Sequence, residues 1–293
     1  MEWIIKKEME GKLLREFLQN DQGFSRRLLK SLIYNGGKLL VNGTEETLRY
    51  ILKPGDIVSV EFALEVKGTY MQAEDIPLDI VYEDDAILII NKQQGIATIP
   101  SFKHQSGTLA NGVLFHYEKH SIPYTVHVVT RLDRDTSGLL LIAKHRFSHS
   151  ILSTLQKQGK VKRKYYAIVE GLLDKKKGII DANIGRKDGS IIERTVREDG
   201  QRAVTHYEVV RETATHSLLQ IQLETGRTHQ IRVHFSHIGH PLAGDDLYGG
   251  QKALINRQAL HCFSLCFEHP VSKEWMTFHA SLPKEMMEIL SDN

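Results

Sequence analysis

The sequence predicts an α+β protein that combines a large unit, built on a largely antiparallel mixed sheet, with a small N-terminal α/β unit. Its 293 residues correspond to roughly two domains at about 150 residues each. Strand-like segments dominate from Ile76 onward, and the helices between them follow no regular β-α-β rhythm, which argues against a doubly wound sheet. Residues 11–62 have a separate pattern of two short helices followed by short strands.

The composition is that of an ordinary globular protein. Hydrophobic residues make up 41% and charged residues 25% of the chain, which excludes wholesale disorder. The net charge of +2 identifies no partner, so a nucleic-acid-binding surface would have to concentrate basic residues locally. Two cysteines, Cys262 and Cys266, are too few for a disulfide scaffold and fit a reducing compartment.

The sequence lacks the patterns of a membrane span and of a signal peptide. The longest apolar runs, such as 139–143, fall far short of the roughly 20 residues that a membrane helix needs. The N-terminal segment MEWIIKKEMEGK carries acids beside its bases and has no long apolar stretch. We therefore expect a cytoplasmic protein without a membrane partner.

Two short helices are predicted at the beginning of the small unit. The first is indicated by apolar residues at helical spacing, namely Leu13, Leu14, Phe17 and Leu18. A polar break follows, and Ser25 is then a typical N-cap for a second helix over 26–33.

Turn signals place the strands of the small unit. A strand over 38–41 leads into an Asn42-Gly43 turn, which is typical of a hairpin. A Pro54-Gly55 turn precedes an alternating strand that ends at residue 62. Residues 63–75 have no clear period, so we expect them to link a domain over 11–62 to a second domain over 76–293.

The second domain is predicted to consist mainly of strands. An acidic turn divides 76–92 into two strands, and 138–143 is an apolar strand buried on both faces. Residues 147–158 have the spacing of a helix. Further strands are predicted over 164–171, 203–210, 216–224 and 229–235.

Residues 22–40 form a local basic segment. They contain Arg26, Arg27, Lys30 and Lys38 and no acid. By charge alone, this cluster fits either a phosphate-binding face or a solvated helix surface. The pattern SRRLLKSLIYNGGKLLVNG, followed by LKPGDIVSV, resembles the RNA-binding domain named after small-subunit ribosomal protein S-four. That resemblance covers 11–62 and implies that Arg26, Arg27 and Lys30 bind RNA.

The most informative segment is TRLDRDTSGLLLIAKH, residues 130–145. Its arginines and aspartates alternate just before the buried strand, and Thr136-Ser137-Gly138 supplies turn chemistry. Asp133 therefore lies on a loop held by a rigid apolar strand, which is a common way to present a catalytic side chain. An Arg-Asp pair that only fixes the loop is the alternative interpretation.

The complete string is much more specific than its parts. Arg-Leu-Asp, two variable residues, Thr-Ser-Gly and an apolar strand together resemble the signature of the RluA-like RNA pseudouridine synthases. Two later segments, KRKYYAIVEG (162–171) and LETGRTHQIRVHFSHIGHPLAGDDLYG (223–249), resemble the other motifs of that family. The resemblance extends over about 76–283. Thr130 stands where the family often has His, and Gln93 where it usually has Pro.

The resemblance implies roles for individual residues. Asp133 matches the catalytic aspartate, and Arg232 matches the arginine that pairs with its carboxylate. Tyr165 matches a tyrosine that lies against the target base, and its neighbour Tyr166 should face the other side of the strand. Arg131 matches an arginine that holds the flipped nucleotide. We also expect phosphate contacts from the basic run Lys160, Lys162, Arg163 and Lys164, with a purely solvated run as the alternative.

Two further expectations concern the wall and the rim of the site. In the predicted strand 229–235, apolar residues alternate with Gln230, Arg232 and His234, as a cleft wall with a polar front requires. Arg227 and His229 are expected at the rim of the site.

The predicted function is isomerisation of specific uridines to pseudouridine in structured RNA. Large-subunit ribosomal RNA is favoured as substrate and transfer RNA is an alternative. An isomerisation implies no cofactor and no metal, and we expect neither a DNA partner nor an oligomer. A noncatalytic RNA-binding ribosome-assembly factor is the alternative outside enzymology. Zinc binding lacks a second cysteine pair. Hydrolysis of a sugar bond usually needs two carboxylates, and the resemblance gives Asp135, the near neighbour of Asp133, no catalytic role.

Overall fold

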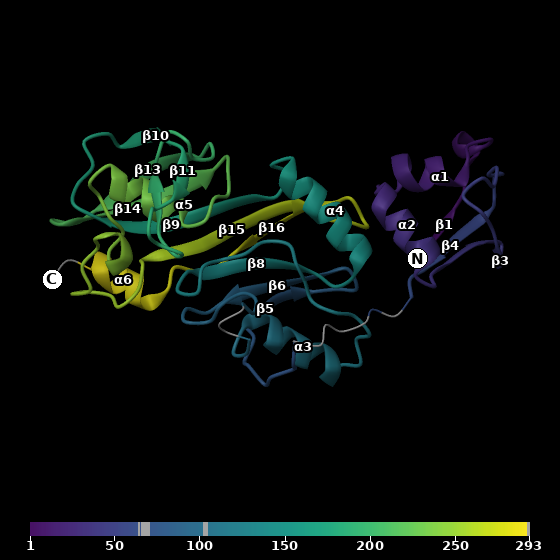
Figure 1. Ribbon diagram of the computed structural model, residues 1–293, viewed down its shortest axis with the longest axis horizontal. Helices are drawn as coiled ribbons and strands as arrows, with labels where there is room; N and C mark the ends of the chain where they lie inside the picture. Colours follow the sequence, from purple (N-terminus) through teal and green to yellow (C-terminus); the bar gives the residue numbers. More distant parts are fainter. Residues whose placement is uncertain (64, 66–70, 102–104, 292–293) are drawn as a thin grey trace.

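The computed structural model describes residues 1–63, 65, 71–101 and 105–291. Within them the strands form a four-stranded sheet near the N-terminus, a ten-stranded sheet and a two-stranded ribbon. Figure 1 shows the small N-terminal sheet at one end of the molecule and the large sheet extending away from it. The predicted α+β class with a largely antiparallel sheet is confirmed: in the ten-stranded sheet every strand pair is antiparallel except β15 with β8.

The N-terminal sheet has the strand order β1-β4-β2-β3. Its strands are β1 (Glu2–Ile4), β2 (Lys38–Val41), β3 (Thr44–Glu45) and β4 (Ile57–Glu61). Between β2 and β3, Asn42 and Gly43 both have positive φ (52° and 78°), as a tight hairpin turn requires. The strand β1 precedes the predicted range 11–62 and pairs with β4.

Two helical segments cover this sheet, as the sequence predicts. They are the short α1 (Leu14–Glu16), continued by η2 (Phe17–Asp21), and α2 (Arg26–Tyr34); a single 3-10 turn, η1 (Lys7–Met9), precedes them. Ser25 is the N-cap of α2, because its hydroxyl oxygen accepts a hydrogen bond from the Leu28 amide at 3.1 Å. The leucines of α2 point inward and its arginines are exposed.

The large sheet has the order β10-β13-β14-β9-β15-β8-β6-β5, with β16 added to β15 and β7 added to β8. The strands before β9 are β5 (Ile80–Glu83), β6 (Ile87–Lys92), β7 (His127–Val128) and β8 (Ser137–Ala143). Those that follow are β9 (Lys162–Glu170), β10 (Lys177–Asp181), β13 (Val204–Glu212), β14 (His216–Leu223), β15 (Leu260–Glu268) and β16 (Trp275–His279). The ribbon consists of β11 (Ile184–Arg186) and β12 (Arg194–Val196).

The strand β8 is the centre of the core. All of its residues are buried: it lies between β6 and β15 in the sheet, and α4 packs against it. Gly138 has φ +111°, and a Cβ there would lie 2.3 Å from the Cys262 carbonyl oxygen. Glycine is therefore required where β8 approaches β15. The remaining helices are α3 (Leu109–Lys119), α4 (Arg146–Lys157), α5 (Gln230–His237), η3 (Asp246–Tyr248) and α6 (Lys284–Leu290).

The prediction of a strand over 229–235 is wrong, because these residues form α5 and the turn before it. The alternation that suggested a strand carries no information here, since Gln230 to Phe235 are all buried. The Gln230 side-chain oxygen accepts hydrogen bonds from the Arg227 amide (3.0 Å) and the Thr225 hydroxyl (2.8 Å). A short apolar run in a sequence is compatible with either a helix or a strand. Here the local hydrogen bonds of Gln230 favour the helix.

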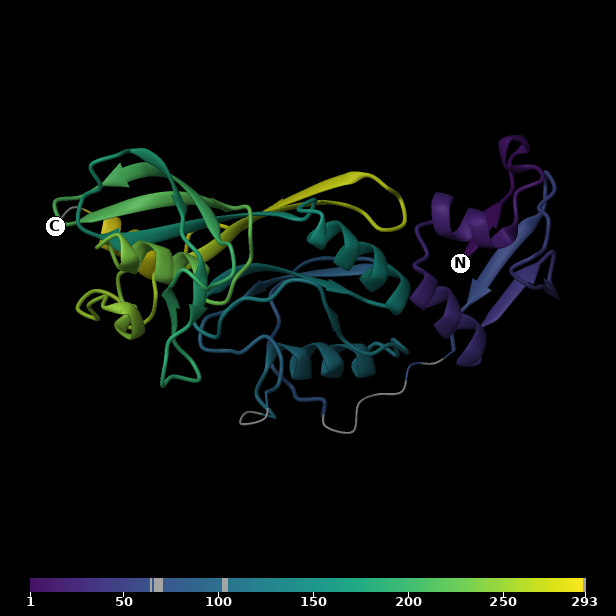
Figure 2. The same ribbon diagram turned by 45° about the horizontal axis from the view of Figure 1, so that its top comes forward.

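The N-terminal unit contacts the large unit through α2 and α4, which lie side by side in both views (Figures 1 and 2). The rings of Phe24 and Phe147 are 4.7 Å apart between centroids, and the Ser150 hydroxyl donates to Ser25 Oγ at 3.2 Å. Each serine lies at or near the N-terminus of its helix. The helices in the described part of the chain are all too short or too polar to cross a membrane.

Candidate active site

A cleft of about 660 Å³ opens on the face of the large sheet that carries the 131–136 loop. Its lining includes this loop before β8, the beginning of β9, residues 226–232 at the beginning of α5, and residues 97–99. Asp133, Tyr165 and Arg232 all belong to this lining. The structure therefore brings together the three residues that the sequence singles out.

Asp133 lies on the loop between β7 and β8. Its backbone carbonyl accepts a hydrogen bond from the Thr136 amide at 3.1 Å, which closes a turn ahead of β8. Its carboxylate is about one-third exposed (32%), so a molecule in the cleft can reach it. Oδ2 lies 3.4 Å from Arg232 Nη1 and 3.8 Å from His229 Nε2.

Hydrogen bonds from Lys92 and Thr98 fix the backbone of this loop. The buried Lys92 ammonium donates to the carbonyl oxygens of Gln93, Ile96 and Arg134 at 2.8 to 2.9 Å. The Thr98 hydroxyl donates to the Leu132 carbonyl at 2.7 Å. Both neighbours of Asp133 are thus fixed. Burial lowers the pKa of Lys92 to about 8, against the attraction of Asp135 and Asp133.

Arg232 approaches Asp133 from α5. Its Nε and Nη2 donate to the two oxygens of the buried Asp245 at 2.7 Å each, which leaves Nη1 for Asp133. The guanidinium also lies 4.9 Å from the centre of the Tyr248 ring. Burial alone would lower the pKa of Arg232, but hydrogen bonds and charge from Asp245 raise it above its usual value. A permanent cation therefore faces Asp133.

Tyr165 forms the inner wall of the cleft. It is buried at the beginning of β9, opposite Cys262 of β15, and burial raises the pKa of its phenol. Its ring lies 5.8 Å from the Arg163 guanidinium. Tyr166 instead stacks on Phe263 with 3.8 Å between ring centroids. The expectation that these two tyrosines face opposite sides of the strand is confirmed.

The basic residues of 160–164 are divided between the two faces of β9. Arg163 shares the face of Tyr165 and lines the cleft beside Arg131, whose carbonyl accepts a hydrogen bond from Arg163 Nη1 at 3.4 Å. Lys162 and Lys164 alternate with Tyr165 along the strand, so their exposed side chains leave the opposite face. Lys160 is exposed in the turn before β9.

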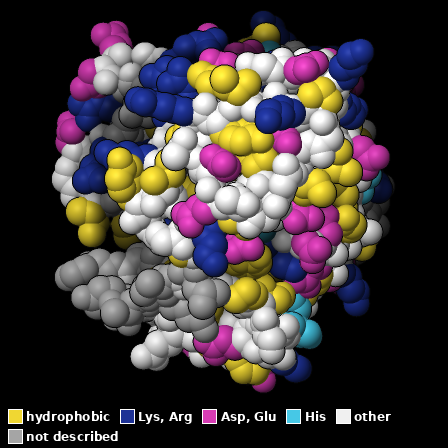
Figure 3. All heavy atoms as spheres, turned by 90° about the vertical axis from the view of Figure 1, so that its right-hand side faces the viewer, with side chains coloured by type: hydrophobic (Ala, Val, Ile, Leu, Met, Phe, Trp, Pro, Cys, Tyr) yellow, Lys and Arg dark blue, Asp and Glu magenta, His cyan; other side chains and the backbone are white. Residues whose placement is uncertain are grey.

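The basic residues of α2 lie outside the cleft. Arg26, Arg27 and Lys30 are exposed on the N-terminal unit. Figure 3 shows this end of the molecule, where Lys and Arg side chains occur with Asp and Glu side chains between them. The helix α4 contacts both α2 and β8, so it lies between the N-terminal unit and the strand that follows the 131–136 loop.

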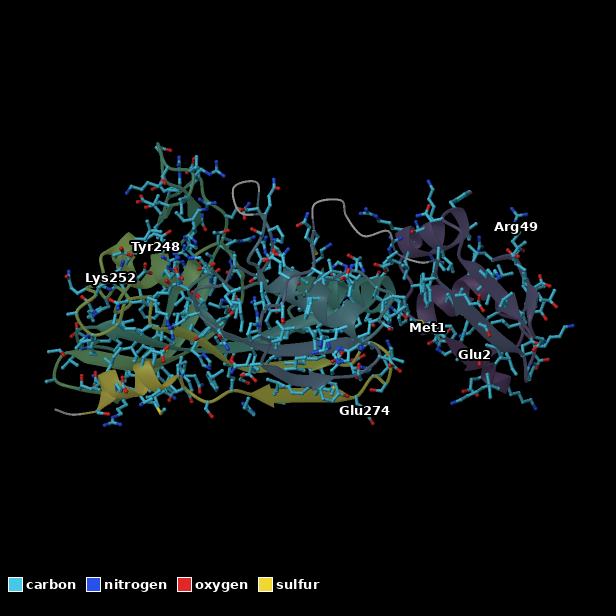
Figure 4. All side chains as sticks on the ribbon, turned by 90° about the horizontal axis from the view of Figure 1, so that it is seen from below. Met1, Glu2, Arg49, Tyr248, Lys252 and Glu274 are labelled. Atoms are coloured by element: carbon cyan, nitrogen blue, oxygen red, sulfur yellow. The ribbon has the colours of Figure 1, made fainter. Side chains whose placement is uncertain are left out.

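His229 comes immediately before α5 and reaches into the cleft. Its backbone is left-handed (φ 56°), an uncommon conformation for a residue with a side chain. Its Nδ1 lies 2.8 Å from the Tyr248 hydroxyl oxygen. That oxygen also accepts a hydrogen bond from the Arg194 backbone amide at 2.9 Å. Tyr248 belongs to the segment after α5 (Figure 4). Burial lowers the pKa of His229, although the charge of Asp133 acts in the opposite direction.

The arrangement is suited to acid-base or nucleophilic chemistry on a nucleotide. It combines one accessible carboxylate, a fixed cation, an imidazole and a buried aromatic ring, with further arginines at the rim. Among the described residues, no three His, Cys, Asp or Glu side chains are grouped closely enough to hold a metal ion. Sequence reasoning missed Lys92 and Asp245, although both stand in segments that carry the family resemblance.

Comparisons with known proteins agree with this geometry. A family model described as RNA pseudouridylate synthase matches residues 86–237. The chain is 53% identical over 268 residues to a Bacillus subtilis (strain 168) protein named uncharacterized RNA pseudouridine synthase YjbO, covering 92% of this chain and 95% of that relative. It is 39% identical over 281 residues to the ribosomal large subunit pseudouridine synthase D of Vibrio cholerae, covering 91% of this chain and 86% of that relative.

Solved structures share the fold. The structure of human RNA pseudouridylate synthase domain containing 1 superimposes with a TM-score of 0.59 at 24% sequence identity, covering 73% of this chain and 85% of that chain. At this identity the superposition supports the architecture of the large sheet and its helices.

Proposed function

Because the chain belongs to the RNA pseudouridine synthase family and isomerises uridine in RNA to pseudouridine, we propose that its substrate is large-subunit ribosomal RNA and that Asp133 is its catalytic carboxylate. The substrate proposal is supported by relatives named ribosomal large subunit pseudouridine synthase D, such as that of Vibrio cholerae. The carboxylate of Asp133 facing Arg232 in an open cleft is the single observation that carries the catalytic proposal.

The reaction detaches uracil from the sugar, turns it and rejoins it through carbon 5. In this proposal the Asp133 carboxylate assists cleavage of the bond between uracil N1 and sugar C1′. The Arg232 cation, 3.4 Å away, stabilises the negative charge of that carboxylate by Coulomb attraction in a partly buried site. Tyr165 lies under the base and keeps it in the cleft while it turns.

The target nucleotide must leave its helix before the glycosidic bond is accessible, and unstacking it costs a few kcal/mol. Arg131 and Arg163 line the cleft and can stack on a base or bind a phosphate of the extruded nucleotide. Arg26, Arg27 and Lys30 of α2 contribute a second RNA contact. Binding should therefore weaken steeply as salt rises.

The proposed organisation is an RNA-binding domain over 11–62, a linker over 63–75 and a catalytic domain over 76–293. The protein acts as a cytoplasmic monomer without a cofactor. The separate N-terminal sheet supports the division, and the joint contact between α2 and α4 supports a fixed orientation of the two domains.

The test uses RNA that carries tritium at uracil carbon 5, separated into ribosomal and transfer fractions. Isomerisation must release this tritium into water. We expect release from ribosomal RNA with the wild type and none with Asp133→Asn, which should still bind RNA. Asp135→Asn is the matched control, because Asp135 lies two residues away and pairs with the exposed Arg134.

Release from transfer RNA alone would overturn the substrate proposal. Release by Asp133→Asn at the wild-type rate would overturn the catalytic proposal. If neither purified fraction reacts, the assay is repeated with immature ribosomal subunits as substrate. No tritium release from these subunits would favour a noncatalytic assembly factor.

A further inference from the structure

We propose that His229 is a further catalytic residue, which removes the proton from uracil carbon 5 after the base has been rejoined and returns a proton to N1. The inference rests on the proposed location of the reaction at Asp133. It follows from the position of the imidazole, from the chemistry of the side chains around the cleft, and from the balance of the reaction.

His229 is the group in the described lining of the cleft best suited to accept a proton at neutral pH. The arginines there stay protonated, namely Arg131, Arg134, Arg163, Arg227 and Arg232. Tyr165 keeps its phenolic proton because it is buried. Asp133 is paired with Arg232 and is assigned to the glycosidic bond. Burial lowers the pKa of the His229 imidazole, which favours its neutral form, and the ring lies in the same cleft.

Its surroundings orient the ring for this task. The Tyr248 hydroxyl oxygen can accept both the Arg194 amide and a proton-bearing Nδ1 of His229. The proposal requires this Nδ1–H tautomer, in which Nε2, 3.8 Å from Asp133 Oδ2, carries the lone pair that accepts the proton. Once Nε2 has taken a proton, the neighbouring carboxylate stabilises the imidazolium.

The backbone of His229 supports a functional reading. A left-handed conformation is disfavoured for a residue with a Cβ and is adopted more readily by Gly and Asn. In a cleft, this conformation is consistent with a side chain that is retained for its function.

The proposed step balances without a co-reactant. The bond from N1 to C1′ breaks, the bond from C5 to C1′ forms, and the bond from C5 to hydrogen breaks as its electron pair restores the ring. One proton passes from C5 to Nε2, and one proton is added at N1. The His229 side chain is partly exposed (13%), so its proton can exchange with water before N1 receives one. This accounts for release of a C5 label.

The experiment compares RNA with hydrogen or deuterium at carbon 5 of the target uridine under single-turnover conditions. In His229→Asn, proton removal should become the slow step. We expect the rate to fall by about 100-fold or more, as for loss of a general base. The isotope effect at C5 should exceed that of the wild type, and added imidazole should restore part of the rate. RNA affinity should not change.

The variants separate chemistry from folding. Asn tolerates the left-handed backbone, and His229→Gly provides a second variant that suits it. Lys273→Asn is the matched control, because Lys273 also has a left-handed backbone (φ 64°) in a turn far along the chain. It should leave the rate unchanged. Tyr248→Phe keeps the ring beside Arg232 but removes the hydroxyl, so it should lower the rate less than His229→Asn.

An unchanged isotope effect together with no restoration by imidazole in both His229 variants would overturn the inference, whatever their rates. A wild-type protein that releases no label from any RNA would instead contradict the proposed function. The two failures are therefore distinguishable.

Discussion

The guanidinium of Arg232 lies between two carboxylates, those of Asp133 in the cleft and Asp245 in the interior. The pair with Asp245 is almost fully buried, with 8% and 1% of the two side chains exposed. A buried charge that loses its partner is strongly destabilising, whereas an exposed pair contributes little. Asp245 therefore fixes both the orientation of Arg232 and the integrity of α5.

We predict that Asp245→Asn lowers the free energy of unfolding by about 3 kcal/mol, because Arg232 would then remain buried beside a neutral amide. Denaturant titration at fixed temperature measures this loss. Asp246→Asn is the control: Asp246 is exposed and pairs with Lys252, so its loss should cost about 0.5 kcal/mol or less. Equal effects of the two substitutions would contradict the prediction.

For single residues, sequence patterns predict the side chains that act on the substrate. They predict less well the side chains that hold those catalytic residues in place. Asp133, Tyr165 and Arg232 occupy recognisable motifs and meet in one cleft. Lys92 donates to the Arg134 carbonyl, 42 residues away, and Asp245 holds the Arg232 guanidinium through contacts made by the folded chain. Such partners exist only once the fold has formed, so spacing along the sequence does not reveal them.

At the element scale, β9 shows where alternation is a reliable guide. Tyr165 faces the cleft and Tyr166 the opposite side, as the period of two requires. The same rule places Arg163 on one face of β9 and Lys162 and Lys164 on the other. The prediction that treated the basic run as one cluster did not make this distinction. In α5 the alternation of apolar and polar residues was misleading, because every residue over 230–235 is buried. Hydrogen bonds at the beginning of this segment favour a helix.

The division of β9 predicts unequal effects on RNA binding. Arg163→Ala should weaken binding of the target RNA about tenfold, since it removes one stacking or phosphate contact in the cleft. Lys162→Ala should change the dissociation constant less than about threefold, because a single exposed lysine on the other face adds only long-range attraction. Titrations at one fixed salt concentration compare them. A larger effect of Lys162 would place an RNA contact on the opposite face of the sheet.

At the scale of the whole molecule, buried histidines link stability to pH. His145 is the N-cap of α4, and His261 forms a hydrogen bond with Ser137, the first residue of β8. Burial lowers the pKa of each to about 4, from an ordinary value near 6.5. Above pH 6.5 both are neutral whether the chain is folded or unfolded. Between pH 6.5 and 4 the unfolded chain binds protons that the folded chain does not, so stability is lost as pH falls.

We therefore predict that the free energy of unfolding declines from pH 6.5 to 4 by up to about 3 kcal/mol for each of these histidines. His145→Gln should make the decline shallower, and chemical unfolding at several pH values measures it. His279→Gln is the control, because His279 is exposed on β16. Identical slopes for wild type and His145→Gln would rule out this origin of acid sensitivity.

The pairing of β8 with β15 also has a consequence for biosynthesis. Ser137 and Gly138, just after the Asp133 loop, pair with His261 and Cys262, more than 120 residues later in the chain. Contacts so distant in sequence form late in folding, because a long loop must be closed first. A growing chain cannot complete this wall of the cleft until β15 has left the ribosome. The protein can therefore modify RNA only after β15 has been translated.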